Sequence, residues 1–457
     1  MKYTYFITAI LAVLTMSSCG IYTNYQRPES LPVDSLYRES VANETDTTTL
    51  ADLSWRELFT DSLLVKWIEL GLEQNTDLQT AHLRTEEAKA TLTASKLAFL
   101  PSVSLTPEGQ LSSFDGAKAT ATYSLGASAD WEIDAFGSLR NAKKGSHAAY
   151  MASLAYEQAV QTQLVATIAD TYYSLVALDK KLAITHETVV KWQENLSAMQ
   201  ALKQAGEQNE AAVAQSEASL LEAKSSVLSL EKQIHELENT FSMLLGIVPQ
   251  NIERSDLFDL CFSEELSVGV PAQLLSRRPD VQQTEWELAE AFYATNKARA
   301  AFYPSITLSG VIGWTNSSGS SIVNPGKWLL NAVGSIVQPL FNHGTNIANL
   351  KIAKAQQEEA VLAFSQKLLD AGAEVNNALT QWQTARKTLV LDKQRIEALQ
   401  TAVRSTQKLM QYGTTNYLEV LTAQQTLLQS QLTEVSDKYD EIQSVISLYH
   451  ALGGGVK

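Results

Sequence analysis

The chain has 457 residues, a formal net charge of −15, two cysteines and ten prolines. Hydrophobic residues make up 45% of it and charged residues 19%, below the ~25% that is usual, which argues for a large core and against widespread disorder. The acidic balance argues against a nucleic-acid partner, and two cysteines exclude a disulfide-dense scaffold or a Cys-rich metal cluster. Length alone suggests about three domains.

Residues 1–18 have the features of a secretory signal peptide. Lys2 precedes an apolar stretch that ends at Leu14, and small residues follow immediately before Cys19. The apolar stretch is too short to span a membrane. A cysteine in this place resembles a bacterial lipobox, so we predict lipidation at Cys19 and a lipid-anchored extension over residues 19–50. The alternative is an ordinary cleaved signal with an incidental cysteine.

Two halves of the chain repeat the same landmarks in the same order. The string that starts at Leu100 matches the one that starts at Tyr303, an offset of 203 residues. Gly206 and Asn209 match Gly413 and Asn416 at an offset of 207, and Leu245-Gly246 matches Leu452-Gly453 at the same offset. Ordered matches with so little drift predict a two-fold internal duplication, since a solenoid would repeat at a much shorter period.

Each half contains a long segment that is typical of a helix. The 60 residues between Gly145 and Gly206 include neither Gly nor Pro and would extend ~90 Å as one helix. Apolar residues recur there at alternating spacings of three and four, and the same rule runs from Val361 to Met410, broken at Asp392 and Thr406. This seam predicts coiled coils, with an ordinary helical-bundle core as the alternative.

Each half also contains segments with a period of two. Apolar and polar residues alternate from Tyr123 to Ile133 and again from Ile306 to Trp314. Alternation over about ten residues is typical of transmembrane barrel strands, although a half-buried soluble sheet gives the same pattern. Two strands per half make four, and four strands cannot close a barrel in lipid, so either the soluble alternative holds or several copies share one barrel.

These observations predict the following organisation. The signal peptide covers 1–18 and the lipid-anchored extension 19–50. The first structural repeat covers 51–250, with helices, a β hairpin at about 101–134 and long helices over 137–245. A connector covers 251–280, which the family resemblance described next places in the equatorial region. The second repeat covers 281–457, with a hairpin at about 304–341 and long helices over 343–451.

Taken together, the lipobox, the duplication and the paired strands and helices resemble the TolC-like outer-membrane efflux proteins, most of all the NodT-like lipoprotein branch that serves RND-type pumps. Single motifs are weak, but their order from residue 19 to about 453 is specific. The strings that carry the resemblance are Tyr25 to Pro28, Trp55 to Asp61, Asn75 to Leu78, Trp131 to Gly137, Leu274 to Val281, Ala301 to Ile306, Gln338 to Phe341 and Tyr412 to Gln425.

The resemblance implies a mainly α chain with a membrane β-barrel portion. Three chains would form a twelve-stranded barrel in the outer membrane and an α-helical tunnel in the periplasm. Such a homotrimer is expected to be a passive exit duct for drugs or other small solutes, with outer-membrane lipid, a periplasmic adaptor (membrane fusion) protein and an inner-membrane RND pump as partners, and without a cofactor.

The resemblance also implies a gate at the periplasmic tip. Glu419 stands in a position that is often acidic in relatives, whereas Thr422 and Thr415 replace an acid and an arginine that some relatives carry. A ring of three Glu419 carboxylates would attract cations. The alternative is that Glu419 lies on a solvated helix face. The turns at Gly206, Asn209, Gly413 and Asn416 are the expected adaptor-docking edge.

No catalytic or metal-binding constellation is present, because the six histidines are scattered and no HExxH, Walker or GxSxG motif occurs. For Arg277-Arg278 we favour a structural role at the start of a helix that continues through Glu290; the alternative is anion binding. Two other functions remain open: the outer-membrane duct of a type I protein secretion system, and a periplasmic coiled-coil lipoprotein without a pore.

Overall fold

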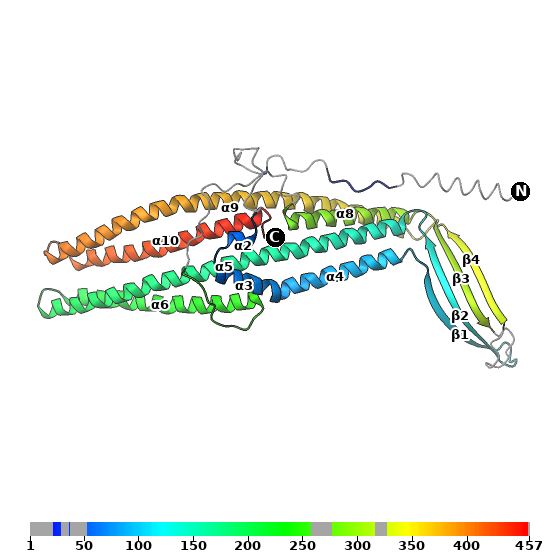
Figure 1. Ribbon diagram of the computed structural model, residues 1–457, viewed down its shortest axis with the longest axis horizontal. Coiled ribbons are helices and arrows are strands. Elements are labelled where there is room, and N and C mark those ends of the chain that lie inside the picture. Colours follow the sequence, from blue (N-terminus) through cyan, green and yellow to red (C-terminus); the bar gives the residue numbers. More distant parts are fainter. Residues whose placement is uncertain (1–21, 29–35, 37–52, 257–276, 316–326, 456–457) are drawn as a thin grey trace. The chain divides into compact units, whose positions relative to one another are not determined.

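The computed structural model describes residues 22–28, 36, 53–256, 277–315 and 327–455, so Cys19 and Cys261 lie outside the described residues. Two compact units are formed from alternating stretches of the chain, the first from 1–31, 83–155 and 282–366 and the second from 32–82, 156–281 and 367–457. The elements, in chain order, are α2 (Trp55–Leu58), α3 (Ser62–Gln74), α4 (Thr76–Leu97), β1 (Ser102–Ser112), β2 (Thr120–Ile133), α5 (Ser138–Gln204), α6 (Glu210–Leu245), α8 (Pro279–Ala300), β3 (Ser305–Thr315), β4 (Lys327–Val337), α9 (Thr345–Gln411) and α10 (Tyr417–Ala451) (Figure 1).

The first unit contains one antiparallel sheet in the order β1-β2-β3-β4. Its register pairs Ser102 with Asp130, Ile133 with Ile306, and Ser305 with Val337. Of these residues, Ser102 and Ser305 begin β1 and β3, and Ile133 and Val337 end β2 and β4, each of them next to a helix. The four helices α4, α5, α8 and α9 therefore all join the sheet at the same end, which we call the helix end of the sheet (Figure 1).

The sheet has one continuous apolar face. The alternation seen in β2 carries across the register, because side chains in one row of an antiparallel sheet point to the same side. From Tyr123 to Ile133 this face extends ~33 Å along β2, or ~25 Å across a bilayer at a tilt of ~40°. One apolar row consists of Leu105, Ala127, Ile312 and Leu330.

Close packing of two central strands requires glycine at Gly313. Gly126 and Gly313 are paired in the register, and a Cβ added to Gly313 would lie 2.3 Å from the Leu125 carbonyl oxygen. Any side chain there would separate β2 from β3.

Two helical hairpins dominate the second unit. α5 and α9 are each unbroken over 67 residues, ~100 Å at 1.5 Å per residue. No described helix combines the length and the apolar composition that a bilayer-spanning helix needs. The seam predicted in α9 is buried at Phe364, Leu368, Ala371, Val375, Ala378, Trp382, Ala385 and Ile396.

Arg278 holds the start of α8 in the second unit. Its side chain is 2% exposed and donates to Asp280, to Glu374 at 2.6 Å and to the Ala451 carbonyl at 3.1 Å. Burial alone would raise the pKa of Asp280, but the hydrogen bonds and positive charges of Arg278 and Lys367 together outweigh it and hold that pKa well below its ordinary value. Arg278 therefore has a structural role, and its helix continues past Glu290 to Ala300.

Candidate functional site

The first hairpin turn, residues 205–209, joins α5 to α6. Gly206 has a φ of 82°, its N–H donates to the Lys203 carbonyl at 3.0 Å, and the Glu207 N–H donates to the Leu202 carbonyl at 2.9 Å. This pair of bonds is a Schellman motif, which favours glycine at the left-handed position. Asn209 then caps α6, where its side chain accepts from the Ala212 N–H at 3.0 Å.

The second hairpin turn, residues 412–416, joins α9 to α10 with the same backbone. Gly413 has a φ of 71°, its N–H donates to the Met410 carbonyl at 3.0 Å, and the Thr414 N–H donates to the Leu409 carbonyl at 3.0 Å. Asn416 caps α10 and accepts from the Glu419 N–H at 3.2 Å. The offset of 207 residues predicted from the sequence therefore holds at the level of individual hydrogen bonds.

The predicted gate residues lie at the start of α10. Glu419 is exposed, and the Thr415 hydroxyl donates a hydrogen bond to its carboxylate. Thr422 does not join this contact: its hydroxyl donates to the Leu418 carbonyl at 2.8 Å, one turn back along its own helix. The structure thus brings Thr415, Asn416 and Glu419 together and leaves Thr422 on the neighbouring turn.

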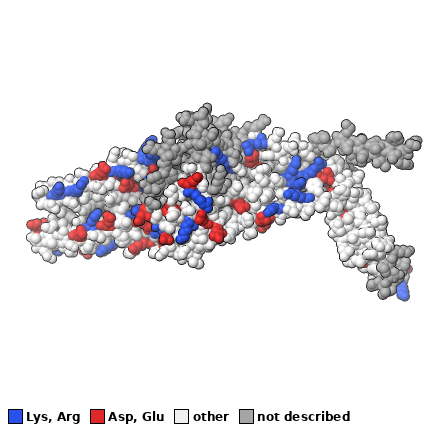
Figure 2. Space-filling model, viewed as in Figure 1, with Lys and Arg blue, Asp and Glu red and all other residues white. Residues whose placement is uncertain are grey.

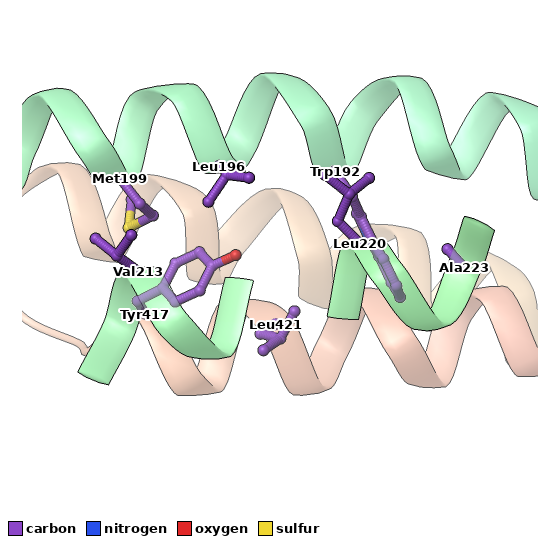
Figure 3. Close-up of a cluster of buried hydrophobic side chains, with 8 residues drawn as sticks. All are labelled: Trp192, Leu196, Met199, Val213, Leu220, Ala223, Tyr417 and Leu421. Atoms are coloured by element: carbon purple, nitrogen blue, oxygen red, sulfur yellow. The ribbon is translucent and has the colours of Figure 1, made fainter. Parts of the chain in front are cut away.

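A buried cluster connects the two hairpins just behind these turns (Figure 3). We call it the hairpin cluster. Tyr417 and Leu421 of α10, 5% and 2% exposed, project toward α5 and α6 and pack with Trp192, Leu196, Met199, Val213, Leu220 and Ala223.

Two amide hydrogen bonds cross the same contact. Asn195 donates to Gln424 at 3.0 Å, and Gln425 donates to Ser219 at 3.2 Å. A movement of one hairpin against the other must therefore break these bonds and expose part of the hairpin cluster.

Two features of the turns were missed in the sequence. Lys203 and Glu210 form an ion pair across the first turn. At the equivalent positions of the second turn, Met410 packs against the hairpin cluster and Tyr417 lies within it. The signal was available, because the offset of 207 aligns Lys203 with Met410 and Glu210 with Tyr417.

The described part of the N-terminal extension packs on the first unit. Arg27 forms a two-point contact with Glu285, at 2.7 and 2.6 Å, and the Tyr25 ring meets the Phe292 ring edge-on at 5.8 Å. Burial, with help from the Glu285 carboxylate, raises the pKa of Tyr25 to about 12, so its hydroxyl stays neutral. A Cβ added to Gly137 would lie 3.0 Å from the Tyr22 ring.

No three described His, Cys, Asp or Glu side chains come together as a metal site. A sheet with an apolar face long enough to cross a bilayer, joined to unbroken helical hairpins, defines the class of duplicated outer-membrane channel chains.

The chain belongs to the outer membrane efflux protein family, whose model matches residues 67–247 and 270–454. It is 30% identical to the cation efflux system protein CusC of Escherichia coli K12, over 97% of each chain. It is 27% identical to the probable efflux pump outer membrane protein TtgC of Pseudomonas putida, over 98% of this chain and 95% of that one.

Solved channel structures have the same fold. A crystal structure of CusC matches with a TM-score of 0.86 at 29% identity, over 95% of this chain and 100% of that one. The open-state outer membrane channel MtrE of Neisseria gonorrhoeae matches with a TM-score of 0.85 at 26% identity, over 95% and 99%.

These findings confirm the family, the fold class, the outer-membrane location and the role as an outer-membrane efflux channel that the sequence predicted. A periplasmic coiled-coil lipoprotein without a pore is no longer an alternative.

Proposed function

We propose that three copies of the chain form one closed barrel and one helical tunnel, and that this trimer is the passive exit duct of a tripartite efflux system. The observation that carries the proposal is the sheet itself. Within the described residues its edge strands are β1 and β4, and an open strand edge is not tolerated in lipid. When three four-stranded sheets are joined edge to edge into a closed barrel, the backbone hydrogen-bonding groups of every strand are paired.

The partners we propose are a periplasmic adaptor and an inner-membrane RND pump. The two hairpin turns support an adaptor, because their Schellman glycines are fully open: a Cβ added to Gly206 or Gly413 meets nothing within 4 Å. Gly206, Asn209, Gly413 and Asn416 form the proposed docking edge. The duct carries no chemistry of its own, so energy comes from the pump.

The proposed gate consists of Glu419, with Thr415 and Thr422 beside it. The hydrogen bond from Thr415 orients the exposed Glu419 carboxylate. In a trimer three such carboxylates surround one axis, where they attract cations and repel anions. The hairpin cluster is the contact that has to rearrange for the ring to widen.

We also propose that Cys19 carries the lipid anchor. Tyr22, three residues later, packs beside Gly137 at the helix end of the sheet. Three residues of extended chain reach at most ~11 Å. An acyl group on Cys19 therefore starts close to the end of the sheet, where it can enter the same membrane.

Small solutes are the proposed cargo. Relatives are named for the efflux of cations, antibiotics, solvents and toluene. Their common factor is small size, which suits diffusion through the proposed trimeric duct. Selection among solutes then falls to the pump.

The test is complementation of a deletion strain in a broad susceptibility panel. The double variant Glu207→Arg with Thr414→Arg places positive charge on both exposed turns and keeps their glycines and asparagine caps, at the cost of one hydrogen bond from the Thr414 hydroxyl to the Leu409 carbonyl. We expect this variant to be present in outer-membrane fractions and to migrate as a trimer in gels of unboiled samples. The strain that carries it should nevertheless be as susceptible as the deletion strain.

The matched control is Glu222→Arg with Thr401→Arg, two exposed helix positions away from the turns. It should restore resistance fully. Full rescue by the turn variant would contradict adaptor docking at the turns, and a monomer in the membrane fraction would contradict the trimeric duct.

A further inference from the structure

Four stretches of this acidic chain contain no Asp or Glu, and all four adjoin the helix end of the sheet. They are residues 88–107, 135–156, 291–304 and 338–357. The last two are the ends of one acid-free run, 291–357, and stretches of similar length occur elsewhere in the chain, for example 398–418. What distinguishes these four is that all of them lie next to the same end of the sheet. The exposed basic residues in these stretches, which we call the basic belt, are Lys89, Lys96, Arg140, Lys143, Lys144, Lys297, Arg299, Lys351 and Lys354.

The sheet register brings the basic belt to one level of the first unit. Ser102, Ile133, Ser305 and Val337 all lie at the helix end of the sheet, and each belt residue is within a few helical turns of one of them. Along α9, for example, Lys354 is ~14 Å from the first helical residue. In Figure 2 the basic side chains gather over these helix ends, next to a sheet that is almost free of charge.

Most of the belt is not neutralised by the protein. Among the described residues, two belt members form ion pairs: Arg140 with Asp134 at 3.0 Å and Lys89 with Glu86 at 3.1 Å. Lys144 reaches the Asn24 side-chain oxygen at 3.1 Å and lies over the Tyr293 ring, while Lys143 lies over the Phe99 ring at 5.8 Å. In these contacts the ammonium nitrogens themselves face the rings or a neutral amide oxygen, and neither partner carries a negative charge. Both lysines therefore keep a full positive charge that can attract an anion.

Aromatic side chains separate the belt from the apolar face. The Trp131 side chain is 39% exposed and its indole N–H donates to the Phe99 carbonyl at 2.9 Å. Tyr303, 40% exposed, stacks on Phe136 at 5.2 Å, and Phe341 is 83% exposed. Apolar strands, then aromatic rings, then cations reproduce the order of a bilayer from hydrocarbon to headgroup.

We propose that the basic belt binds the phosphate groups of anionic phospholipids in the periplasmic leaflet of the outer membrane. The inference rests on the outer-membrane location and on the trimer and lipid anchor proposed above, and not on the pump or the adaptor. Asn24 indicates which side of the first unit faces lipid. It belongs to the N-terminal extension that follows the proposed lipid anchor at Cys19, and its side chain contacts Lys144 of the belt. The belt would fix the depth of the channel in the membrane at the level where the lipid anchor enters.

The experiment compares lipid binding by the purified full-length trimer in detergent. The probes are fluorescent phosphatidylglycerol and phosphatidylcholine. The belt variant is Lys143→Gln, Lys144→Gln, Lys351→Gln and Lys354→Gln. The matched control, Lys224→Gln, Lys387→Gln, Lys393→Gln and Lys408→Gln, removes the same charge from exposed positions outside the belt.

We expect the wild-type trimer and the control to prefer phosphatidylglycerol, and this preference to fall as salt is added. A lysine near an anionic surface is worth about fivefold, so the belt variant should lose at least about tenfold in affinity for this lipid. Its weaker binding of phosphatidylcholine should not change. Free glycerol phosphate should not displace the lipid, because the belt is a surface and not a phosphate pocket.

Equal lipid preference in the belt variant and the control would overturn the proposal, as would displacement by free glycerol phosphate. Binding to isolated peptidoglycan that depends on the belt, with lipid binding unaffected, would overturn it in favour of a cell-wall contact. If the fourfold variant fails to form trimers, the pairs Lys143→Gln with Lys144→Gln and Lys351→Gln with Lys354→Gln make the same test one helix at a time. None of these outcomes bears on efflux, which the complementation assay measures separately.

Discussion

The turn between α5 and α6 and the turn between α9 and α10 end their first helices with the same two backbone hydrogen bonds and start their second helices with the same asparagine cap. Their side chains have diverged. Where the first turn has the exposed ion pair Lys203–Glu210, the second has Met410 and Tyr417 packed into the hairpin cluster.

This difference shows which parts of a duplicated unit are constrained. Schellman glycines and caps are needed to reverse a helix in five residues, so both copies keep them. The residues around them are free to serve different contacts. The first turn stays polar on its outer side, and the second inserts an aromatic ring that holds the two hairpins together.

The largest difference between the two turns is expected when the effect of Tyr417→Ala is compared with that of Glu210→Ala. Removing a buried aromatic side chain costs about 3–5 kcal/mol, whereas removing one partner of an exposed ion pair costs less than ~1 kcal/mol. Hydrogen exchange should show that the first turns of α10 open at least about a hundredfold more often in Tyr417→Ala than in the wild type. In Glu210→Ala the exchange rates of α6 should be almost unchanged. Similar exchange in the two variants would mean that Tyr417 does not anchor the hairpins.

Gly206→Ala and Gly413→Ala test the shared part. An added Cβ meets no atom at either position, so the whole cost comes from the left-handed backbone, about 1–2 kcal/mol. We expect the two variants to be destabilised by the same amount in thermal unfolding of the trimer. Gly109→Ala, in a strand where an added Cβ also meets nothing, is the control for a change of glycine without a positive φ. Unequal losses at Gly206 and Gly413 would show that the backbone equivalence does not extend to energetics.

The two coiled coils also differ at one buried seam position. The first copy has Thr185, whose hydroxyl donates to the Lys181 carbonyl at 2.8 Å, and the second has Asp392, 3% exposed. One Asp392 oxygen is paired with Arg395 at 2.8 Å; the other is buried without a donor among the described residues. The pKa of the neighbouring Asp437 is raised from 3.8 to about 6. Burial is the main cause, and the carboxyl groups of Asp392 and Asp440 add to it, whereas the positive charge of Arg395 lowers this pKa by a smaller amount.

This carboxyl pair predicts a pH dependence that the first copy lacks. A raised pKa means that the folded state binds more protons than the unfolded state between pH 3.8 and about 6, so stability falls as pH rises through that window. Since Asp437 is partly exposed, the loss is about 1 kcal/mol rather than the full shift. Asp392→Asn should flatten this slope in unfolding measured at about pH 4 and about pH 7. If the stability of Asp392→Asn changed with pH as steeply as that of the wild type, the pH dependence would come from other groups.

The sequence predicted most of the fold because its signals were repeated. The period of two in the strands and the alternating spacing in α9 each recur, and the register and the buried seam agree with them. The partners of the turns could not be predicted. Thr415 was noted for the arginine that it replaces, but its hydrogen bond to Glu419 depends on a rotamer that no spacing encodes. The burial of Tyr417 depends on contacts with α5, over two hundred residues earlier in the chain.

The smallest expected effect concerns Glu419, which is exposed at the second turn and has Ala212 as its equivalent in the first. Glu419→Ala therefore makes the two turns alike at this position without altering the asparagine cap, which uses the backbone N–H. If three Glu419 carboxylates line the duct, their loss should lower the ratio of potassium to chloride permeability in a planar bilayer by about twofold. Glu222→Ala removes the same charge from an exposed position on α6 and should leave the ratio unchanged. Because Thr415→Ala keeps the carboxylate and removes only its hydrogen bond, it should preserve selectivity. An unchanged ratio in Glu419→Ala would place this carboxylate on a solvated outer face, and the second turn would then differ from the first in packing alone.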